Sequence, residues 1–373
     1  MENLMTNIAV GSSIVDMPPE GLFPDGRRYN SYVGYFRRRY GARLQKVVID
    51  AGFTCPNRDG FLSHGGCTFC DNAAFHPAYS CASKPIAEQI DEGVEFHRGR
   101  YRNTTAYLAY FQSYSNTYAP LERLKEVYLQ ALAHPSVVGI VIGTRPDCVD
   151  EEKLDFLRDL SEGKVLDGWS REMPLSAKSA EGELLRFERP VVIVEYGIES
   201  CYDKTLRRVN RGHDFASARK AVEMTAERGL ECGAHFILGL PGESREMMLE
   251  ECGLIDSLPL TTVKFHQLQI VRGTAMETEF ARCPQDFERF TLEEYVDFFV
   301  DMLERLRPEL CIERFAGEVP PRFVNGTPWG LVRNVELLRM LEGRLFARAT
   351  WQGRRVRSGG LTALSGLSKS SRP

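Results

Sequence analysis

Short apolar runs alternate with longer amphipathic segments through the middle of the chain. Runs rich in β-branched and aromatic residues predict six strands, at 46–51, 105–111, 137–143, 190–197, 231–239 and 262–270. Spaced apolar positions predict helices between them, at 86–98, 121–133, 151–160, 215–228 and 244–256. Helical connections of this length join parallel strands, so the pattern predicts an α/β fold. Both a doubly wound open sheet and an incomplete barrel satisfy this alternation.

The remaining sequence divides the chain into an N-terminal arm, a core with one insertion, a C-terminal extension and a tail. The expected bounds are 1–45, 46–275 with the insertion at 163–189, 276–352 and 353–373. The insertion is polar and could be a lid, a partner surface or a neutral addition. The extension has a helical pattern at 291–306. The tail is rich in Gly, Ser and basic residues, which predicts disorder.

Composition and charge narrow the class of protein. Of 373 residues, 43% are hydrophobic and 26% are charged, which is typical of an ordered globular chain. Basic and acidic residues number 47 and 51, so nucleic acid or an anionic membrane would have to bind a local patch. No apolar stretch is long enough to span a bilayer, and the first residues do not resemble a secretory signal. We therefore expect a cytoplasmic protein with no membrane partner.

Three of the ten cysteines lie on a glycine-rich loop directly after the first predicted strand. Cys55, Cys67 and Cys70 form a C-x11-C-x2-C pattern in GFTCPNRDGFLSHGGCTFC. In both candidate folds, ligands bind at the carboxyl ends of the strands, which is where this loop begins. Glycines allow the loop to fold back, so the three thiolates can meet at one metal centre.

Two kinds of metal centre fit three cysteines. An iron-sulfur cluster held by three thiolates leaves one iron open to a further ligand. A structural zinc ion would need a fourth protein ligand, which Cys81, His64 or His76 could supply. The spacing alone leaves both centres open.

The cysteine loop and several later motifs resemble the radical S-adenosylmethionine (radical SAM) superfamily. GFTCPNRDG followed by GGCTFC is similar to its uncharacterised YhcC-type branch, as are YLAYFQSYSNTYAP, GTRPDCV, VEYGIESCYDKTLRRVNRGHDF and HFILGLPGES. TRPD, NRGH and IVRGT also resemble the radical domain of the Elongator catalytic subunit. The resemblance covers about residues 40–274. It implies a partial (β/α)6 TIM-like barrel of parallel strands, with an N-terminal arm and a C-terminal α+β extension.

The resemblance implies an oxygen-sensitive enzyme with two cofactors. Cys55, Cys67 and Cys70 would bind a 4Fe-4S cluster, whose open iron would chelate S-adenosylmethionine. One electron from the cluster would then break a carbon–sulfur bond and release a 5'-deoxyadenosyl radical. The electron would come from a donor protein of the flavodoxin or ferredoxin type.

The resemblance also assigns further site residues. S-adenosylmethionine is expected to contact residues after the second and fourth strands and in the fifth strand: Gln112, Ser113, Glu199, Arg211, His235 and Gly239. Arg211 would pair with the methionyl carboxylate, because guanidinium is always charged and binds bidentately. An isolated histidine on an apolar strand, such as His235, is equally compatible with a core residue. The substrate is expected to contact residues on or after the sixth strand, namely Lys264, His266, Gln267 and Arg272.

The arm contains a basic and aromatic stretch. From Arg27 to Lys46 there are seven basic residues, no acidic ones, and five Tyr or Phe. Cations that alternate with rings are typical of single-stranded nucleic acid binding, so RNA, including tRNA, is a candidate substrate. The proposed contacts are Arg27, Arg28, Arg37, Arg38 and Arg39. Alternatively, the arm is an amphipathic segment whose rings are buried against the barrel.

Three functions therefore remain open at the level of sequence. The first is a radical SAM enzyme that acts on RNA. The second is a radical SAM enzyme that acts on a small metabolite or a protein. The third is a non-catalytic zinc-loop protein that binds nucleic acid.

Overall fold

The centre of the molecule is a curled, all-parallel sheet. The computed structural model describes residues 17–74, 76–99, 106–164, 175–178, 184–325, 329 and 332–356. The sheet contains β1 (Leu44–Ile49), β2 (Ala106–Phe111), β3 (Val137–Thr144), β6 (Val191–Glu199), β7 (Glu231–Leu238), β8 (Thr262–Gln267) and β9 (Cys311–Arg314). Their order across the sheet is the same as their order along the chain. In a doubly wound sheet the order of the strands would reverse at one point, which it does not do here. The structure is therefore the expected partial barrel.

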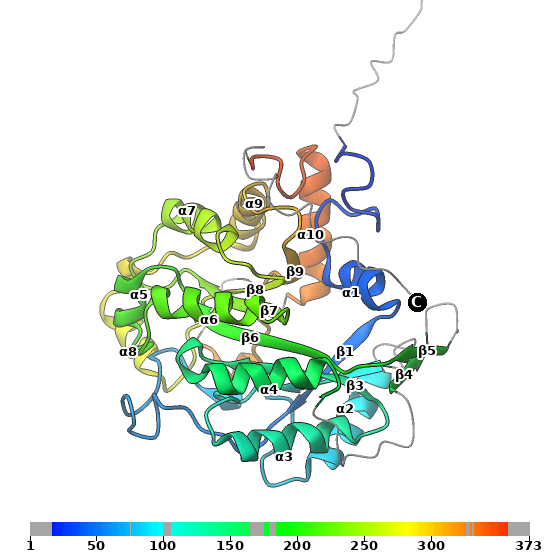
Figure 1. Ribbon diagram of the computed structural model, residues 1–373. Coiled ribbons are helices and arrows are strands. Elements are labelled where there is room, and N and C mark those ends of the chain that lie inside the picture. The colour runs from blue at the N-terminus through cyan, green and yellow to red at the C-terminus, as the bar shows by residue number, and fades with distance from the viewer. Residues whose placement is uncertain are drawn as a thin grey trace, which may run out of the picture.

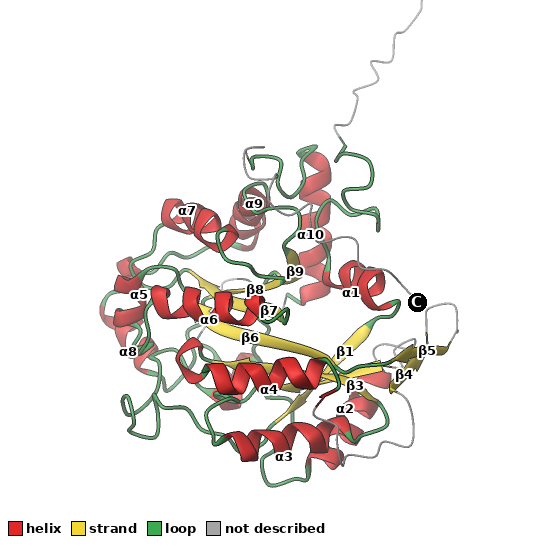
Figure 2. Cartoon of the chain, viewed as in Figure 1, coloured by secondary structure: helices red, strands yellow, loops and turns green. Residues whose placement is uncertain are grey.

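Helices follow the strands and cover the outer face of the sheet (Figure 2). They are α2 (Ile86–Arg98), α3 (Leu121–Leu132), α4 (Glu151–Ser161), α5 (Asp203–Arg208), α6 (Phe215–Glu227), α7 (Arg245–Asp256) and α8 (Ala275–Arg282). Asp150, Asp214 and Ser244 cap three of them, each side chain accepting a bond from a backbone N–H of the first turn. Single 3-10 turns occur at Asn72–Ala74, Pro146–Cys148, Pro284–Asp286 and Pro321–Phe323. All six predicted strands and all five predicted core helices are present.

The C-terminal extension adds a seventh strand and two helices. β9 pairs in parallel with β8, while α9 (Leu292–Leu303) and α10 (Asn334–Ala347) pack together beside it (Figure 1). A capping box between Thr291 and Glu294 fixes the start of α9, the helix expected at 291–306. The sixth predicted strand, 262–270, is shorter than expected and ends at Gln267.

The N-terminal arm closes the amino end of the barrel. Its helix α1 (Tyr32–Tyr40) lies next to β9, and a parallel bridge joins Ser31 to Ile312. Phe36 is fully buried among Leu44 and other apolar residues at the amino ends of the strands. The rings of the arm are therefore mostly packed inside, as the alternative interpretation of this segment expects.

The described part of the insertion forms an antiparallel hairpin, β4 (Leu175–Lys178) and β5 (Leu184–Phe187). Phe187 stacks on Tyr40 with ring centroids 6.4 Å apart, and Leu185 packs beside the end of α1. A segment between a helix and the next strand lies at the amino end of that strand, away from the carboxyl-end mouth. The hairpin is therefore not a lid over the mouth.

The start of the predicted tail is ordered. The N–H of Gly353 donates to the carbonyl of Leu303 over 2.9 Å, and that of Arg355 donates to Glu304 over 2.8 Å. These bonds hold residues 353–356 against the end of α9, so the expected disorder is wrong for them. The rest of the expected tail, 357–373, lies outside the described residues. Across the described part of the chain, we find no helix with the length and apolar character that crossing a membrane requires.

Candidate active site at the cysteine loop

The three loop cysteines line one cavity at the carboxyl ends of the strands. The cavity measures about 430 Å³, and Cys55, Cys67 and Cys70 all contribute to its wall. The N–H groups of Arg58 and Asp59 donate to the carbonyl of Cys55 over 2.8 and 3.2 Å, which closes a turn after the first cysteine. Backbone φ angles of 86° and 84° at two adjacent glycines then return the chain to the other two cysteines.

Hydrogen-bond donors surround the thiols. Arg211 is buried, and its Nη1 lies 3.4 Å from Cys67 Sγ, while Asn57 Nδ2 lies 3.6 Å from the same sulfur. Burial, together with the neighbouring Cys67, raises the pKa of the Cys70 thiol to about 12. Burial opposes the charge of Arg211, but Cys67 and Glu199 outweigh it and raise its pKa. Burial therefore favours the neutral Cys70 thiol, whereas the donors of Arg211 and Asn57 would stabilise negative charge on the Cys67 sulfur.

Among the described residues, two buried guanidinium groups on this cavity wall each have one nitrogen without a hydrogen-bond partner. Arg145 binds Asp147 through Nε and Nη2 over 2.9 and 2.7 Å, which leaves its Nη1 buried without a partner. Arg211 donates to Gly197 and leaves Nε buried without a partner. An unsatisfied buried donor costs about 1–3 kcal/mol. These unused donors and the three thiols fit an anionic occupant such as a thiolate-bound cluster or a carboxylate.

The same geometry argues against the zinc-loop alternative. Within the described residues, no group of three or more Cys, His, Asp or Glu converges closely enough to hold one metal ion. Zinc needs all of its ligands around one atom, whereas the irons of a cluster each take a separate cysteine. Of the proposed fourth ligands, Cys81 and His64 are exposed, and His76 Nε2 is hydrogen-bonded to Ser113 over 2.8 Å.

A layer of charged side chains forms the floor below the cavity. Glu195 on β6 is completely buried and accepts bonds from Lys46, from Lys264 Nζ over 2.6 Å and from His235 Nε2 over 3.1 Å. Lys46 also contacts Glu313 over 2.7 Å, which joins β1 to β9 across the open edge of the barrel. Although burial opposes it, attraction to the two lysines holds the pKa of Glu195 well below its usual range. The floor is therefore ionised and internally paired.

Many, but not all, of the residues predicted from sequence meet at the cavity. Those that line it are Gln112, Glu199, Arg211, His235, His266 and Gln267. Burial lowers the pKa of both histidines, so both are neutral near pH 7. Ser113, next to Gln112, is instead buried against His76.

Three further predicted residues lie elsewhere. Lys264 belongs to the charged floor and is bound by Glu195. Gly239 has a φ of 89° and faces the carbonyl of Glu288, away from the cysteines. Arg272 lines a separate hollow on the outer side of the cysteine loop, and its Nε donates to Val324 over 3.0 Å. We do not find these three on the wall of the cysteine cavity.

The extension supplies part of the cavity wall that the sequence did not reveal. These residues are Arg314, Gly317, Glu318, Val319 and Asn334. Arg314 is the last residue of β9 and the others come later in the chain. β9 has only four residues, and its apolar part is Cys311 and Ile312. That signal is too short to predict a strand from periodicity.

Comparison with known proteins places the chain in a family. Residues 178–255 match the model described as the radical SAM superfamily, and residues 260–346 match the radical SAM C-terminal domain. The uncharacterised protein YtqA of Bacillus subtilis is 31% identical over 88% of this chain and 92% of its own. Protein YhcC of Escherichia coli is 33% identical over 77% of this chain and 82% of its own.

A solved structure agrees with the fold. The archaeal Elp3 of Methanocaldococcus infernus superimposes with a TM-score of 0.58 at 16% identity. The match covers 83% of this chain and 64% of the Elp3 chain. The cysteine loop, the curled parallel sheet and the sequence matches agree. The chain therefore belongs to the radical SAM superfamily, in the branch that includes YhcC.

Proposed function

We propose that this enzyme reductively cleaves S-adenosylmethionine at a 4Fe-4S cluster bound by Cys55, Cys67 and Cys70. The proposal is carried by one observation: three free cysteines of one loop share a cavity with two buried arginines that have unused donors. When bound there, the cluster and S-adenosylmethionine would supply a one-electron cleavage of a carbon–sulfur bond that yields a 5'-deoxyadenosyl radical.

The residues around the cysteines would bind and orient these groups. Arg211 lies beside Cys67 and 3.6 Å from Glu199, so it can balance charge on the cluster side and on the cofactor side. Glu199 has a φ of 75°, a strained value for this residue. The register of β6 against β7 shifts between Gly197 and Glu199. This irregularity places the Glu199 carboxylate on the cavity wall, where it can accept bonds from ribose hydroxyls.

Iron binding tests the proposal independently of turnover. We expect anaerobically purified protein to be brown with about four irons, as three cluster thiolates imply. Cys55→Ala, Cys67→Ala and Cys70→Ala should each abolish the absorbance and the release of 5'-deoxyadenosine under dithionite. Cys81→Ala, an exposed cysteine outside the cavity, is the matched control and should retain both. A colourless protein with one tightly bound zinc would contradict the proposal.

An electron donor would approach from the outer side of the loop. A surface hollow of about 370 Å³ is lined by Cys67, Cys70, Arg58 and Arg272. It supports docking of an acidic flavodoxin or ferredoxin close to two of the cluster ligands. Reduction by flavodoxin should slow in Arg272→Glu, while reduction by dithionite should not.

RNA is a candidate substrate, and one exposed run of basic residues supports it. Arg37, Arg38 and Arg39 are exposed at the end of α1. Arg27 and Arg28 are less available, because Arg27 is bound to Glu342 and Arg28 donates to Thr350 over 3.2 Å. Tyr29 and Phe36 are buried and cannot stack on bases. Loss of co-purifying RNA in the triple variant R37A/R38A/R39A would support this substrate, and unchanged RNA would count against it.

A further inference from the structure

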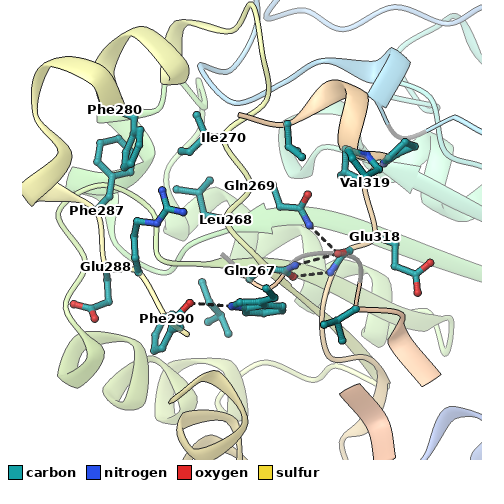
Figure 3. Close-up of a pocket in the computed structure, with 18 of the residues that line it drawn as sticks. Gln267, Leu268, Gln269, Ile270, Phe280, Phe287, Glu288, Phe290, Glu318 and Val319 are labelled. Carbon is teal, nitrogen blue, oxygen red and sulfur yellow. Dashed lines mark hydrogen bonds between the residues drawn. The ribbon is translucent and has the colours of Figure 1, made fainter. Parts of the chain in front are cut away.

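A second cavity lies directly beside the cysteine cavity. It measures about 400 Å³ and is built largely by the C-terminal extension (Figure 3). Its lining combines the end of β8 with the segments around α8, α9 and the loop after β9. None of the contacts proposed for the cluster or S-adenosylmethionine uses its aromatic end. The cavity is within the range of volumes that hold small-molecule ligands.

The two cavities share a wall. Residues 267–269 and 317–319 line both of them. Gln267 and Gln269 each donate to the carbonyl of Gly317, over 3.1 and 2.9 Å, and the N–H of Gly317 donates back to Gln267 over 2.8 Å (Figure 3). A Cβ at Gly317 would lie 2.7 Å from His266 Nδ1, so only glycine allows this approach. The two cavities adjoin at these residues, so a molecule that extends past them would reach from the second cavity into the cysteine cavity.

The far end of the second cavity is apolar and aromatic. Phe280 and Phe287 meet edge to face with centroids 5.2 Å apart, and Phe290 and Trp329 continue the wall. The indole N–H of Trp329 is satisfied by the carbonyl of Phe290 over 2.9 Å. This end therefore offers ring faces and no free donor from Trp329, which suits an apolar group.

The rim of the second cavity carries available positive charge. Glu288 accepts a bond from Arg245 over 2.6 Å, and Glu318 accepts one from the N–H of Asn334 over 2.5 Å. Both carboxylates point away from the cavity (Figure 3). Arg289 and Arg333 also line the cavity and are exposed, and neither forms an ion pair within the described residues. The Arg289 guanidinium lies over one face of the Phe280 ring, 5.0 Å from its centroid, which places it next to the apolar end. Arg245, Arg289 and Arg333 thus stand against the two carboxylates, so these five groups together carry a net positive charge.

A polar group on the shared wall also has no hydrogen-bond partner in the part of the chain that the structure describes. Gln269 Oε1 is buried without a hydrogen bond, and its orientation is fixed because Nε2 must face the Gly317 carbonyl. A ligand N–H or O–H would satisfy it. The apolar end, the cationic rim and the polar wall together suit an organic molecule that has both an apolar part and a negatively charged group.

We propose that the second cavity binds the non-reacting part of a small-molecule substrate, an apolar organic acid, whose reacting carbon extends across the shared wall to the cysteine cavity. The reaction part of this proposal rests on the proposed function, but acid binding does not. Rings and aliphatic groups would pack on Phe280, Phe287 and Trp329. The carboxylate would pair with Arg289 and Arg333, since guanidinium binds carboxylates bidentately.

Fluorescence displacement tests acid binding on the full chain. We would bind 1-anilinonaphthalene-8-sulfonate as a reporter and displace it with decanoate, with decanol as the neutral match. R289A/R333A should lower the affinity for decanoate roughly 5- to 10-fold and the affinity for decanol less than about 2-fold. R282A/R339A removes two exposed arginines outside the cavity and is the matched control. Equal effects of both pairs on decanoate would overturn the proposal.

A second variant fills the cavity itself. Val332 lines the second cavity but not the cysteine cavity. Val332→Trp should therefore block the binding of decanoate and of decanol alike and leave the iron absorbance unchanged. Should this variant fail to fold, the two exposed arginine pairs still decide the question. Displacement of the reporter by tRNA, but not by decanoate, would also overturn the proposal. Acid binding without iron would refute the proposed function alone, and iron without acid binding would refute this site alone.

Discussion

At the scale of single residues, the cysteine cavity depends on buried charges that have defined partners. Arg211 shows this most directly, because it contacts Cys67, Glu199 and the carbonyl of Gly197 from one guanidinium. A lysine keeps the charge but presents a single ammonium group in place of the planar fork. Replacing Arg211 with lysine therefore tests the geometry of its contacts separately from its charge.

Arg211→Lys should fold and bind iron but hold S-adenosylmethionine poorly. We expect affinity to fall roughly 10-fold or more, since directed hydrogen bonds to a charged partner are lost while the charge stays. Equilibrium dialysis with S-adenosylmethionine and iron analysis of the same sample measure both properties. Equal loss of iron and of cofactor affinity would mean that Arg211 acts mainly on the cluster.

Lys264 was expected to contact substrate, but its position predicts a structural effect. It is bound to Glu195 in the buried floor, so Lys264→Met leaves that carboxylate with less compensation. We expect the free energy of unfolding to fall by about 3–5 kcal/mol in chemical denaturation. The double variant K264M/E195L removes both charges and should recover part of this loss. No recovery would show that the two residues do not act as a pair.

At the scale of elements, a buried acid pair connects helix α7 and the turn before it to the segment that follows β6. Glu243 accepts a bond from Ser200 over 2.5 Å, and Glu251 accepts one from the N–H of Cys201 over 2.6 Å. Both therefore hold the segment that follows Glu199 on β6. Burial raises the pKa of Glu243 to about 7, and burial together with the charge of Glu243 raises that of Glu251 to about 8.

This pair predicts that stability decreases as pH rises. The folded pKa values lie above the unfolded value of about 4.3, so the stabilising contribution is complete below that pH and is lost as pH passes through about 7 to 8. Each group loses about 1.4 kcal/mol per pH unit below its folded pKa, so we expect the free energy of unfolding to fall by on the order of 7 kcal/mol between pH 5 and 8.5. Glu251→Gln should flatten this slope in urea titrations. Glu250→Gln, an exposed neighbour on the same helix, should not.

Elements also show which features the sequence could predict. The six core strands were predicted because each contains a run of β-branched or aromatic residues between turn signals. The cavity position of Gln112 followed from the rule that ligands bind at strand ends, but its neighbour Ser113 lies against His76. β9 has four residues, and its position comes from contacts with β8 and Asn30. Such long-range pairing produces no periodic pattern in the sequence, so β9 could not be predicted from periodicity.

At the scale of the whole molecule, segments far apart in sequence close a barrel that its own strands leave open. The arm blocks the amino end through α1, and the extension adds β9 to the sheet (Figure 1). Residues of the extension also line both cavities. The ion pair between Lys46 and Glu313 then joins the two edge strands. The arm therefore has a structural role whether or not RNA binds its exposed arginines.

Opposite faces of α1 should differ sharply in their effect on stability. Phe36 is fully buried among the amino ends of the strands, so Phe36→Ala should lower the free energy of unfolding by about 3–5 kcal/mol through a lost ring and a cavity. R37A/R38A/R39A removes a half-buried hydrogen bond of Arg38 with Asn30, and the contacts of Arg39 with Glu231 and the Tyr40 ring, so it should cost about 2 kcal/mol or less. Urea denaturation of both variants measures the difference. If the triple variant were as unstable as Phe36→Ala, the basic face would be part of the barrel closure and could not be assigned to RNA.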